Sequence, residues 1–363
     1  MEPFLVVGTR PEIIKMTPII HAWEKKENDL FLLHTGQHYS SYMSDAFFQD
    51  MDLREPDKNL NIGSGSHSEQ TAKALLGIEE QLQKVKPPLV VVQGDTNAVL
   101  SAALAAVKLN IPVAHVEAGL RSFDIRMPEE HNRRLTDHAS TLLFAPTTEA
   151  AQTLERENVW GEVYVTGNTV IDAVERYMPI ALKKRDIMDR LDIDFEEYAL
   201  LTLHRAENVD DPSILKGLIE GILQLDANVV FSTHPRTVAR LEEFGLMKKV
   251  ESSKHMILIE PVPYLDFLKL MHGSSYILTD SGGIQEEATA PSLSKRVFVL
   301  RTSTERPEAV DSGYAHVVGV TPEVFPNRIK TILHEPFEPA ACPYGNGNAA
   351  KKITRIMVQR YEK

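Results

Sequence analysis

The sequence predicts an α/β protein built from two doubly wound domains. Short continuous apolar runs alternate with stretches of helical spacing, which indicates parallel strands buried on both faces and joined by helices. The runs fall into two groups of about six, with a polar gap between them. The length of 363 residues also suits two or three domains of the usual size, roughly 150 residues each.

The expected strands follow in order along the chain. In the first half they are residues 4–7, 30–34, 89–93, 113–116, 141–145 and 163–165. In the second half they are residues 198–203, 229–233, 256–259, 276–279, 297–300 and 316–320. Stretches such as 99–109 and 214–225 carry apolar residues at helical spacing, so strand–helix–strand units are expected.

The polar gap predicts a domain boundary near residue 170. Between Asn168 and Glu197 the chain carries a charged run, 183–190, that is typical of a solvated helix and linker. The expected domains are therefore 1–170 and 171–347. Residues 348–363 have a helical pattern after a loop, and we expect this last helix to pack back on the first domain.

Composition and charge exclude several classes of protein. The 39 Lys and Arg against 51 Asp and Glu give a net charge of −12, so the overall field repels nucleic acid and anionic membranes. The single cysteine, Cys342, excludes a disulfide framework and a cysteine-rich metal cluster. The apolar runs are too short to span a membrane and no signal peptide is visible, which predicts a cytoplasmic protein.

Unusual polar residues gather after the expected strands in both halves. In open α/β sheets, ligands bind at the carboxyl ends of the strands. The polar segments there are 8–12, 35–38, 93–96, 115–119 and 128–134 in the first half, and 203–208, 233–236 and 279–283 in the second. If these were ordinary surface residues, similar polar segments would also occur at the opposite strand ends. We therefore expect a ligand site in a cleft between the two domains.

The segment Thr279-Asp280-Ser281-Gly282-Gly283 indicates a buried strand that ends where a helix begins. Glycines let a ligand approach the backbone closely, and free N–H groups at a helix start suit an anion such as a diphosphate. Arg301 and Arg306 follow the next strand, and Glu287 lies where it can bond sugar hydroxyls. A plain N-cap turn is the alternative, but it needs at most one glycine.

Three acids, Asp95, Glu117 and Glu129, lie at strand or helix ends that would face one cleft. Carboxyl groups brought close together acquire different proton affinities, as acid/base chemistry requires. The spacing of Glu129 with Arg133, and of Glu130 with Arg134, also suits ion pairs on a helix, so one such pair is expected to be purely structural.

Three basic side chains are candidates for holding a phosphate or sugar. Arg10 and Lys15 follow the first expected strand, although Lys15 taken alone is typical of a solvated helix residue. His204 ends the first strand of the second domain beside Arg205, and it could donate to a phosphate oxygen or serve as an acid. The spacing of the histidines gives no zinc motif, so no metal is expected.

Familiar nucleotide and hydrolase motifs fail or are missing. Gly345-Asn346-Gly347-Asn348-Ala349-Ala350 matches G-x-G-x-x-A, but no buried strand precedes it. The chain has no G-x-x-x-x-G-K-[ST] loop and no G-x-S-x-G elbow. Nicotinamide chemistry, ATP-dependent chemistry and serine hydrolysis are therefore disfavoured, and no cofactor is expected.

Taken together, the motifs resemble those of the non-hydrolysing UDP-N-acetylglucosamine 2-epimerases. The matching segments are 8–15, 94–96, 115–121, 128–130, 166–172, 279–287 and 304–308, and the resemblance spans residues 4 to about 355. It implies two Rossmann-like domains as in GT-B glycosyltransferases, a UDP-N-acetyl sugar as substrate, no added cofactor, and a homodimer.

The reaction that this resemblance implies is the interconversion of UDP-GlcNAc and UDP-ManNAc by anti elimination of UDP to 2-acetamidoglucal and re-addition. Four alternatives stay open. They are a GT-B glycosyltransferase that uses a UDP-sugar, a 2-epimerase of a modified UDP-HexNAc such as a 2,3-diacetamido uronate, a hydrolysing epimerase, and a nucleotide-sugar-binding regulator without catalysis.

The resemblance also implies roles by matching position. Asp95, Glu117 and Glu129 are acid/base candidates whose individual protons stay unassigned, and His204 holds the diphosphate and assists its departure. The substrate-binding candidates are Arg10, Lys15 and Arg133 in the first domain and Val262, Phe267, Ser281, Gly282, Gly283, Glu287 and Arg306 in the second.

Three positions depart from the family pattern. Ala206 stands where a second arginine is common, Val262 where glutamine is frequent, and Ser294-Lys295-Arg296 where Gly-Lys-Pro is usual. The first departure weighs against allosteric activation by UDP-GlcNAc, which is described for bacterial relatives. The candidates for such a second site are Gln37, Gln70 and Glu130.

Overall fold

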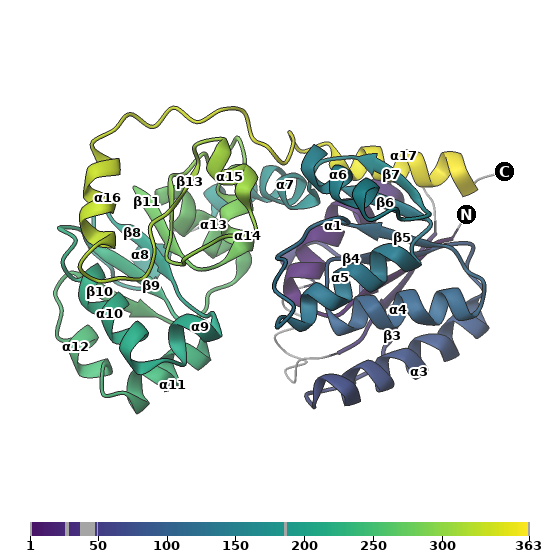
Figure 1. The fold of residues 1–363 in the computed structure, drawn as a ribbon, viewed down its shortest axis with the longest axis horizontal. Helices are drawn as coiled ribbons and strands as arrows, with labels where there is room; N and C mark the ends of the chain where they lie inside the picture. The colour runs from purple at the N-terminus through teal and green to yellow at the C-terminus, as the bar shows by residue number, and fades with distance from the viewer. Residues whose placement is uncertain (1, 26–28, 37–47, 49, 185–186, 362–363) are drawn as a thin grey trace. The chain divides into compact units, whose positions relative to one another are not determined.

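The computed structural model describes residues 2–25, 29–36, 48, 50–184 and 187–361 (Figure 1). The chain divides into two compact units. Unit 1 comprises Met1–Ala173 and Tyr344–Lys363, and unit 2 comprises Val174–Pro343. Each unit has its own parallel sheet with helices between the strands, so the predicted fold class, α/β with two doubly wound domains, is confirmed.

The described strands of unit 1 form a parallel sheet in the order β3-β2-β1-β4-β5-β6-β7. Their bounds are β1 Phe4–Val7, β2 Phe31–His34, β3 Lys58–Asn59, β4 Val90–Gln93, β5 Val113–Val116, β6 Leu142–Ala145 and β7 Glu162–Val165. The strand order reverses between β1 and β4. The carboxyl ends of these two strands are therefore where an open sheet of this kind binds its ligand.

The two outer strands of this sheet differ from the prediction. β3 was not expected, because Lys58 and Asn59 are exposed and form no apolar run. β7 was expected to be buried on both faces, and that is wrong, since Glu162 and Val165 at its two ends are exposed. Both strands lie at an edge of the sheet, where a continuous apolar run is not needed.

The described strands of unit 2 form a second parallel sheet, in the order β10-β9-β8-β11-β12-β13. Their bounds are β8 Ala199–Thr202, β9 Val229–Ser232, β10 Met256–Ile259, β11 Tyr276–Thr279, β12 Val297–Val299 and β13 Ala315–Val317. Here the strand order reverses between β8 and β11, which again points to their carboxyl ends as the ligand position.

Helices follow most of the strands. In unit 1 they are α1 Arg10–Glu24, α3 His67–Val85, α4 Asn97–Lys108, α5 Pro128–Ala139, α6 Thr148–Arg156 and α17 Ala349–Tyr361. In unit 2 they are α8 Ile187–Arg190, α9 Ala206–Val209, α10 Pro212–Ile222, α11 Pro235–Glu243, α12 Met247–Glu251, α13 Tyr264–Gly273, α14 Gly282–Glu287, α15 Pro307–Asp311 and α16 Phe325–Leu333. Helix α7, Thr169–Lys183, contains the division between the units, and its Tyr177 is fully buried, so this part of the polar gap is not solvated.

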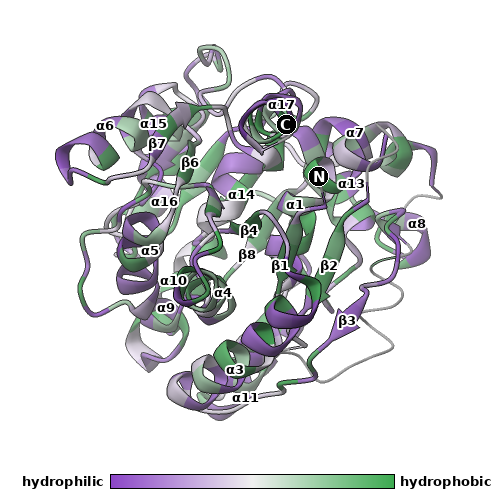
Figure 2. Ribbon diagram, turned by 90° about the vertical axis from the view of Figure 1, so that its right-hand side faces the viewer, coloured by the Kyte–Doolittle hydropathy of each residue, from purple (hydrophilic) through white to green (hydrophobic). Residues whose placement is uncertain are grey.

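The core of unit 1 forms where helices cover the sheet. Ala102, Ala103, Ala105 and Ala106 on α4 are almost fully buried, and their small side chains let the helix lie close to the strands. Figure 1 shows α3 and α4 on one face of this sheet and α1 and α17 on the other. The strands β1, β2 and β4 are strongly hydrophobic, as Figure 2 shows, because helices cover both of their faces.

The last helix of the chain is held to unit 1 by its N-terminus. Asp172 accepts hydrogen bonds from the backbone N–H groups of Ala349 at 3.1 Å and Ala350 at 3.0 Å. Gly345 and Gly347 just before it adopt φ of 104° and 75°, which glycine permits. The segment that matched a dinucleotide pattern is therefore the start of α17, and this helix packs against α1.

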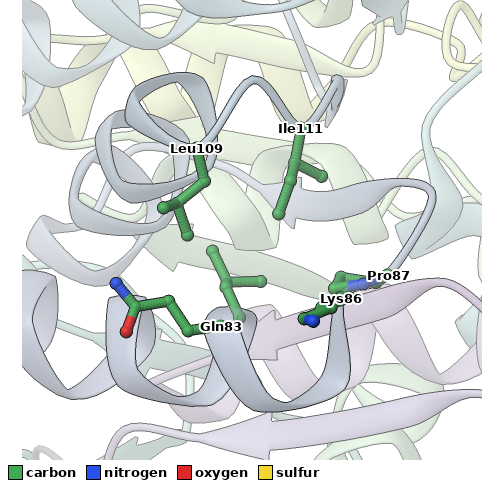
Figure 3. Close-up of a pocket in the computed structure, with 6 residues that line it drawn as sticks. Gln83, Lys86, Pro87, Leu109 and Ile111 are labelled. Atoms are coloured by element: carbon green, nitrogen blue, oxygen red, sulfur yellow. The ribbon is translucent and has the colours of Figure 1, made fainter.

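A cavity of about 390 Å³ lies at the opposite edge of the unit 1 sheet, where β4 and β5 begin (Figure 3). Its lining comes from the ends of α3 and α4 and the turns after them: Leu82, Gln83, Lys86, Pro87, Leu109 and Ile111. None of the predicted site residues is among them. In the part of the chain that the structure describes, no helix is both long and apolar enough to span a membrane.

Candidate functional site

The turn after β1 is closely packed at the carboxyl edge of the unit 1 sheet. A Cβ on Gly8 would lie 2.7 Å from Thr35 Oγ1 and 3.1 Å from the Ala98 side chain, so only glycine fits there. Thr9 precedes α1 in extended conformation, and Pro11 occupies the first turn of that helix. This turn therefore determines the position of Arg10, which is half-buried at the start of α1.

Lys15, one turn further along α1, reaches the end of β5. Its Nζ lies 2.5 Å from Oε2 of Glu117, and Nε2 of Gln93 at the end of β4 donates to the same oxygen at 2.8 Å. The alternative interpretation of Lys15, a solvated helix residue, is therefore wrong, since Lys15 is buried and paired with an acid that is 102 residues away in sequence. Glu117 itself has φ of 68°, an uncommon conformation for a residue with a side chain.

Asp95 follows β4 and is held from α5. Arg133 contacts its Oδ2 with Nε at 2.9 Å and with a second guanidinium nitrogen at 2.7 Å. Asn132 donates to the backbone carbonyl of Asp95 at 2.9 Å. Two consecutive residues of α5 thus fix both the side chain and the backbone of this acid. Arg133, a predicted substrate ligand, is engaged here by protein carboxylates.

Glu129 and Glu130, neighbours on α5, have different surroundings. Glu130 is buried and accepts from Arg134 at 3.0 Å, Arg133 at 3.1 Å and the Ser122 backbone at 2.8 Å. The expected structural ion pair is therefore Glu130 with Arg134. Among the described residues, no hydrogen bond or ion pair holds the half-exposed Glu129. Of the two carboxyl groups, that of Glu129 is therefore the one that can exchange a proton with a ligand.

Glu12 is a buried acid of this edge that the sequence patterns did not single out. Its Oε2 accepts from the backbone N–H groups of Gly8 and Thr9, and its Oε1 is buried without a hydrogen-bond partner among the described residues. Burial raises the pKa of Glu12 to about 7, against the opposing effect of these hydrogen bonds, and the charge of Asp95 adds to the increase. The sequence Thr9-x-x-Glu12 has the pattern of a capping box, but this pattern does not show that Glu12 is buried.

A buried polar network lies behind these acids. His115 on β5 contacts Asp137 with Nδ1 at 2.7 Å and the Gly94 carbonyl with Nε2 at 2.8 Å. Asp137 also pairs with Arg121 at 2.7 Å, and Arg121 grips Glu157 with two nitrogens. This network fixes Gly94, the residue before Asp95.

In unit 2, Asp280 organises the turn after β8. It is fully buried at the end of β11 and accepts from the backbone N–H of His204 and Arg205 and from Asn208 Nδ2 at 3.1 Å. His204 Nδ1 lies 3.1 Å from it, so the other ring nitrogen is available to a ligand. Burial opposes ionisation of Asp280, but His204 and these donors outweigh it and lower its pKa. Sequence reasoning treated Asp280 only as the end of a strand.

Arginines and glutamates form a cluster beside this turn. Arg301 contacts Glu305 at 2.6 Å and Glu207 at 2.9 Å, and Arg306 contacts Glu286 at 2.5 Å. Burial disfavours the charge of Glu305, but Arg301 and its neighbouring arginines lower its pKa to about 2. The predicted ligand Arg306 is therefore also a buried ion-pair partner of α14.

The remaining predicted residues of unit 2 lie on α13 and α14. Gly282 and Gly283 open α14 after Ser281, and a Cβ at either glycine would meet only ordinary contacts. Nothing inside the fold therefore requires glycine there. Glu287 is buried. Burial of the Tyr264 hydroxyl raises the pKa of Tyr264, and the negative charge of Glu287 adds to this increase. The structure places Val262 just before α13 and Phe267 on it, both half-buried.

The residues predicted for a second, allosteric site are only partly described. Gln37 lies outside the described residues. Gln70 accepts from Asn97 at 3.3 Å and donates to the Gly63 carbonyl at 3.4 Å, whereas Glu130 is held by arginines of its own helix. Within the described segments, no group of three or more His, Cys, Asp or Glu side chains is arranged to hold a metal ion.

Comparisons with known proteins identify the family. The family model for UDP-N-acetylglucosamine 2-epimerase matches residues 21–358. A UDP-N-acetylglucosamine 2-epimerase of Methanocaldococcus jannaschii is 49% identical over 98% of this chain and 99% of its own. A UDP-2,3-diacetamido-2,3-dideoxy-D-glucuronate 2-epimerase of Pseudomonas aeruginosa is 36% identical over 99% of this chain and 100% of its own.

Solved structures agree with this assignment. The M. jannaschii UDP-GlcNAc 2-epimerase in complex with UDP-GlcNAc and UDP has a TM-score of 0.91 at 48% identity, over 99% of this chain and 100% of its own. The Neisseria meningitidis UDP-GlcNAc 2-epimerase bound to UDP-GlcNAc has a TM-score of 0.89 at 35% identity, with the same coverage. Since family model, relatives and structures match almost the whole length, the chain belongs to the UDP-N-acetylglucosamine 2-epimerase family.

Proposed function

We propose that this protein interconverts UDP-GlcNAc and UDP-ManNAc without net hydrolysis of the bond between the sugar and the diphosphate. The observation that carries the proposal is the end-to-end match to UDP-N-acetylglucosamine 2-epimerases, such as the M. jannaschii enzyme at 49% identity. The chain keeps acids at the ends of β4 and β5 in unit 1 and a histidine beside arginines in unit 2, which is what the chemistry needs.

The chemistry follows from the position of the hydrogen that moves. C2 of the sugar has no neighbouring carbonyl group, so its hydrogen is too weakly acidic for simple proton abstraction. Anti elimination solves this problem: a base takes the hydrogen from C2, a C1–C2 double bond forms, and the C1–O bond breaks as UDP leaves with the electron pair. A proton then reaches the opposite face of C2, and UDP adds back to C1.

The acids of unit 1 would move the hydrogen at C2. Asp95 and Glu117 are held in fixed positions by Arg133, Lys15 and Gln93, which pre-organises them for proton transfer. Glu129 has no such partner among the described residues, so its side chain can change rotamer when substrate binds. Replacing Asp95 by Asn or Glu117 by Gln should lower kcat by roughly 10²–10⁴-fold, the usual contribution of general acid–base catalysis, while UDP still binds.

The groups of unit 2 would hold the UDP. His204 is oriented by Asp280 and presents its second nitrogen to a phosphate oxygen, where it stabilises the departing diphosphate. Ser281 and the two glycines of α14 leave room for a diphosphate at the backbone, and Glu287 and Arg306 would contact the nucleotide. Phe267 would pack near the uracil, with main-chain contact at Val262.

A modified substrate is the second candidate. It is favoured by the full-length similarity to the P. aeruginosa enzyme named for a diacetamido uronate sugar, at 36% identity. The higher identity to enzymes named for UDP-GlcNAc favours the unmodified sugar.

We also propose that the protein is a homodimer and that it is located in the cytoplasm, as the family resemblance implies. Light scattering of the purified protein tests the dimer.

The experiment that tests the function uses the purified protein and UDP-GlcNAc in D2O, followed by NMR. The proposal predicts UDP-ManNAc that carries deuterium at C2, with no stoichiometric release of UDP. Free ManNAc with equal UDP would indicate a hydrolysing enzyme, and transfer to an added acceptor would indicate a glycosyltransferase. Epimerisation of only the diacetamido uronate substrate would favour the second candidate.

A further inference from the structure

Asp137, a fully buried residue of α5, connects two turns at the ligand-binding edge of the unit 1 sheet. Its Oδ1 lies 2.7 Å from Nδ1 of His115, and Nε2 of His115 lies 2.8 Å from the carbonyl oxygen of Gly94. Its Oδ2 accepts a hydrogen bond from the backbone N–H of Gly119 at 3.3 Å and lies 2.7 Å from the Arg121 guanidinium group. One oxygen therefore reaches the turn after β4 through His115, and the other contacts the turn after β5 directly.

These two turns carry the acids Asp95 and Glu117. Gly94 immediately precedes Asp95 in the turn after β4, and Gly119 lies two residues beyond Glu117 in the turn after β5. We propose that Asp137 is a positioning residue for epimerisation, because it fixes the turn that carries Asp95 relative to the turn that carries Glu117. This inference rests on the function proposed above.

The backbone of the turn after β5 shows why a buried acceptor matters there. Glu117 has φ of 68° and Gly119 has φ of 87°. A left-handed conformation at a residue with a side chain costs free energy and persists only where the surroundings impose it. The backbone N–H groups of Glu117 and Ala118 both donate to the Phe144 carbonyl at 3.1 Å. The next N–H group, that of Gly119, donates to Asp137, which therefore helps to hold this turn in its unusual conformation.

A role in stability alone is the alternative, because the loss of a buried polar network destabilises a protein wherever the network lies. Asp172 provides a matched example in the same unit. It is also a buried carboxylate, and it accepts hydrogen bonds from the backbone N–H groups of Ala349 and Ala350. These bonds join α7 to α17 rather than to either acid-bearing turn. Asp172→Leu therefore serves as a control for the loss of a buried carboxylate as such.

Two variants separate the contacts of Asp137. Leucine has the same branching as aspartate but accepts no hydrogen bond, so Asp137→Leu removes the links to both turns. Phenylalanine keeps a planar ring without nitrogen atoms, so His115→Phe removes only the link to Gly94. If Asp137 acts on Gly94 through His115, the two substitutions share this link, and their effects on turnover should not be additive.

The test combines steady-state kinetics with calorimetric titration of UDP on the full-length protein. We expect Asp137→Leu to lower kcat by roughly 10-fold or more, because small displacements of reacting groups cost rate. The Kd for UDP should stay unchanged, since unit 2 would hold the UDP. His115→Phe should also lower kcat, and the double variant should lose less than the product of the two single losses. Asp172→Leu should lower the free energy of unfolding but keep the wild-type kcat.

Amide hydrogen exchange reports the two turns separately. In Asp137→Leu, exchange should become faster at residues 94–96 and at residues 117–121. In His115→Phe, the increase should be concentrated at residues 94–96, because Asp137 still contacts Gly119 and Arg121. Asp172→Leu should leave exchange in both turns as it is in the wild type.

Three results would overturn the inference: full turnover in folded Asp137→Leu, single losses that multiply in the double variant, or faster exchange in one turn alone in Asp137→Leu. If Asp137→Leu does not fold, His115→Phe decides. Slower turnover with wild-type affinity for UDP would support the inference, and unchanged turnover would contradict it. A wild-type protein that forms no UDP-ManNAc would refute the proposed function instead. The exchange data would still decide whether Asp137 couples the two turns.

Discussion

Lys15 and Glu117 form a buried ion pair, with 2.5 Å between Nζ and Oε2, although 102 residues separate them in the sequence. The pair joins the second turn of α1 to the residue that follows β5. It brings a positive charge directly against an acid that we propose to act at C2 of the sugar.

Breaking this pair should impair both catalysis and folding. Lys15→Met leaves the Glu117 carboxylate without its cation, so we expect kcat to fall by roughly 10²-fold, as for a misplaced catalytic group. The free energy of unfolding should decrease by about 3 kcal/mol, the usual cost of removing one partner of a buried pair. Urea denaturation and initial-rate assays measure the two effects. Lys25→Met, at an exposed lysine after the same helix, is the control and should change neither quantity.

Gln93 should matter through Glu117. The Gln93→Leu variant keeps the side-chain size but removes the amide that donates to Glu117 at 2.8 Å. We expect kcat to decrease about 10-fold, with little effect on UDP affinity, since one charge-assisted hydrogen bond is lost. Gln83→Leu, at an exposed glutamine by the opposite edge of the same sheet, should keep full activity. Equal kinetics for the two variants would show that Gln93 has no role in positioning Glu117.

Asp280 should be required for UDP binding by unit 2. Asp280→Asn weakens the acceptor that orients His204 and the backbone of Arg205, so we expect the Kd for UDP to rise about 10-fold in calorimetry. Asp211→Asn, at the exposed cap of α10, should leave the Kd unchanged. Because the pKa of Asp280 is lowered in the folded protein, its stabilising contribution is present above the unfolded value of 3.8 and is lost as the pH falls through the folded value.

Glu12 should make stability depend on pH in the opposite direction. Its pKa is raised from 4.5 to about 7 in the folded protein, so the folded state binds this proton more tightly than the unfolded state. The stabilising contribution is complete below 4.5 and is lost as the pH rises to about 7, a change of about 3 kcal/mol. The difference in unfolding free energy between the wild type and Glu12→Gln should therefore drift across this window. A constant difference from about pH 4 to about pH 8 would contradict the raised pKa.

The strands and the ligand-binding edges could be predicted because they depend on local patterns. Continuous apolar runs mark strands that are covered on both faces, and this identified every described strand except β3, whose two exposed residues carry no such signal. Polar residues after the runs identified Asp95 and Glu117, because parallel strands bring their carboxyl ends to one edge.

The partners within the site could not be predicted in the same way. Lys15 was predicted as a substrate ligand, but its pairing with Glu117 was not foreseen, because that contact depends on tertiary packing between α1 and β5. The same holds for the contact of Arg133 with Asp95 and for the burial of Glu12. Residue spacing reports contacts along one helix, such as Glu130 with Arg134, but contacts between elements need the fold.

The measurement that tests the central claim most directly is positional isotope exchange in UDP-GlcNAc labelled with 18O at the oxygen that bridges C1 and the β-phosphorus. If UDP leaves and returns, the label must spread to the non-bridging β-phosphate oxygens while deuterium from D2O enters C2, and NMR detects both. We predict that both labels appear together in wild-type protein, and that 18O scrambling is strongly reduced in Asp95→Asn. Deuterium entry at C2 with the 18O label still confined to the bridge would contradict elimination and re-addition.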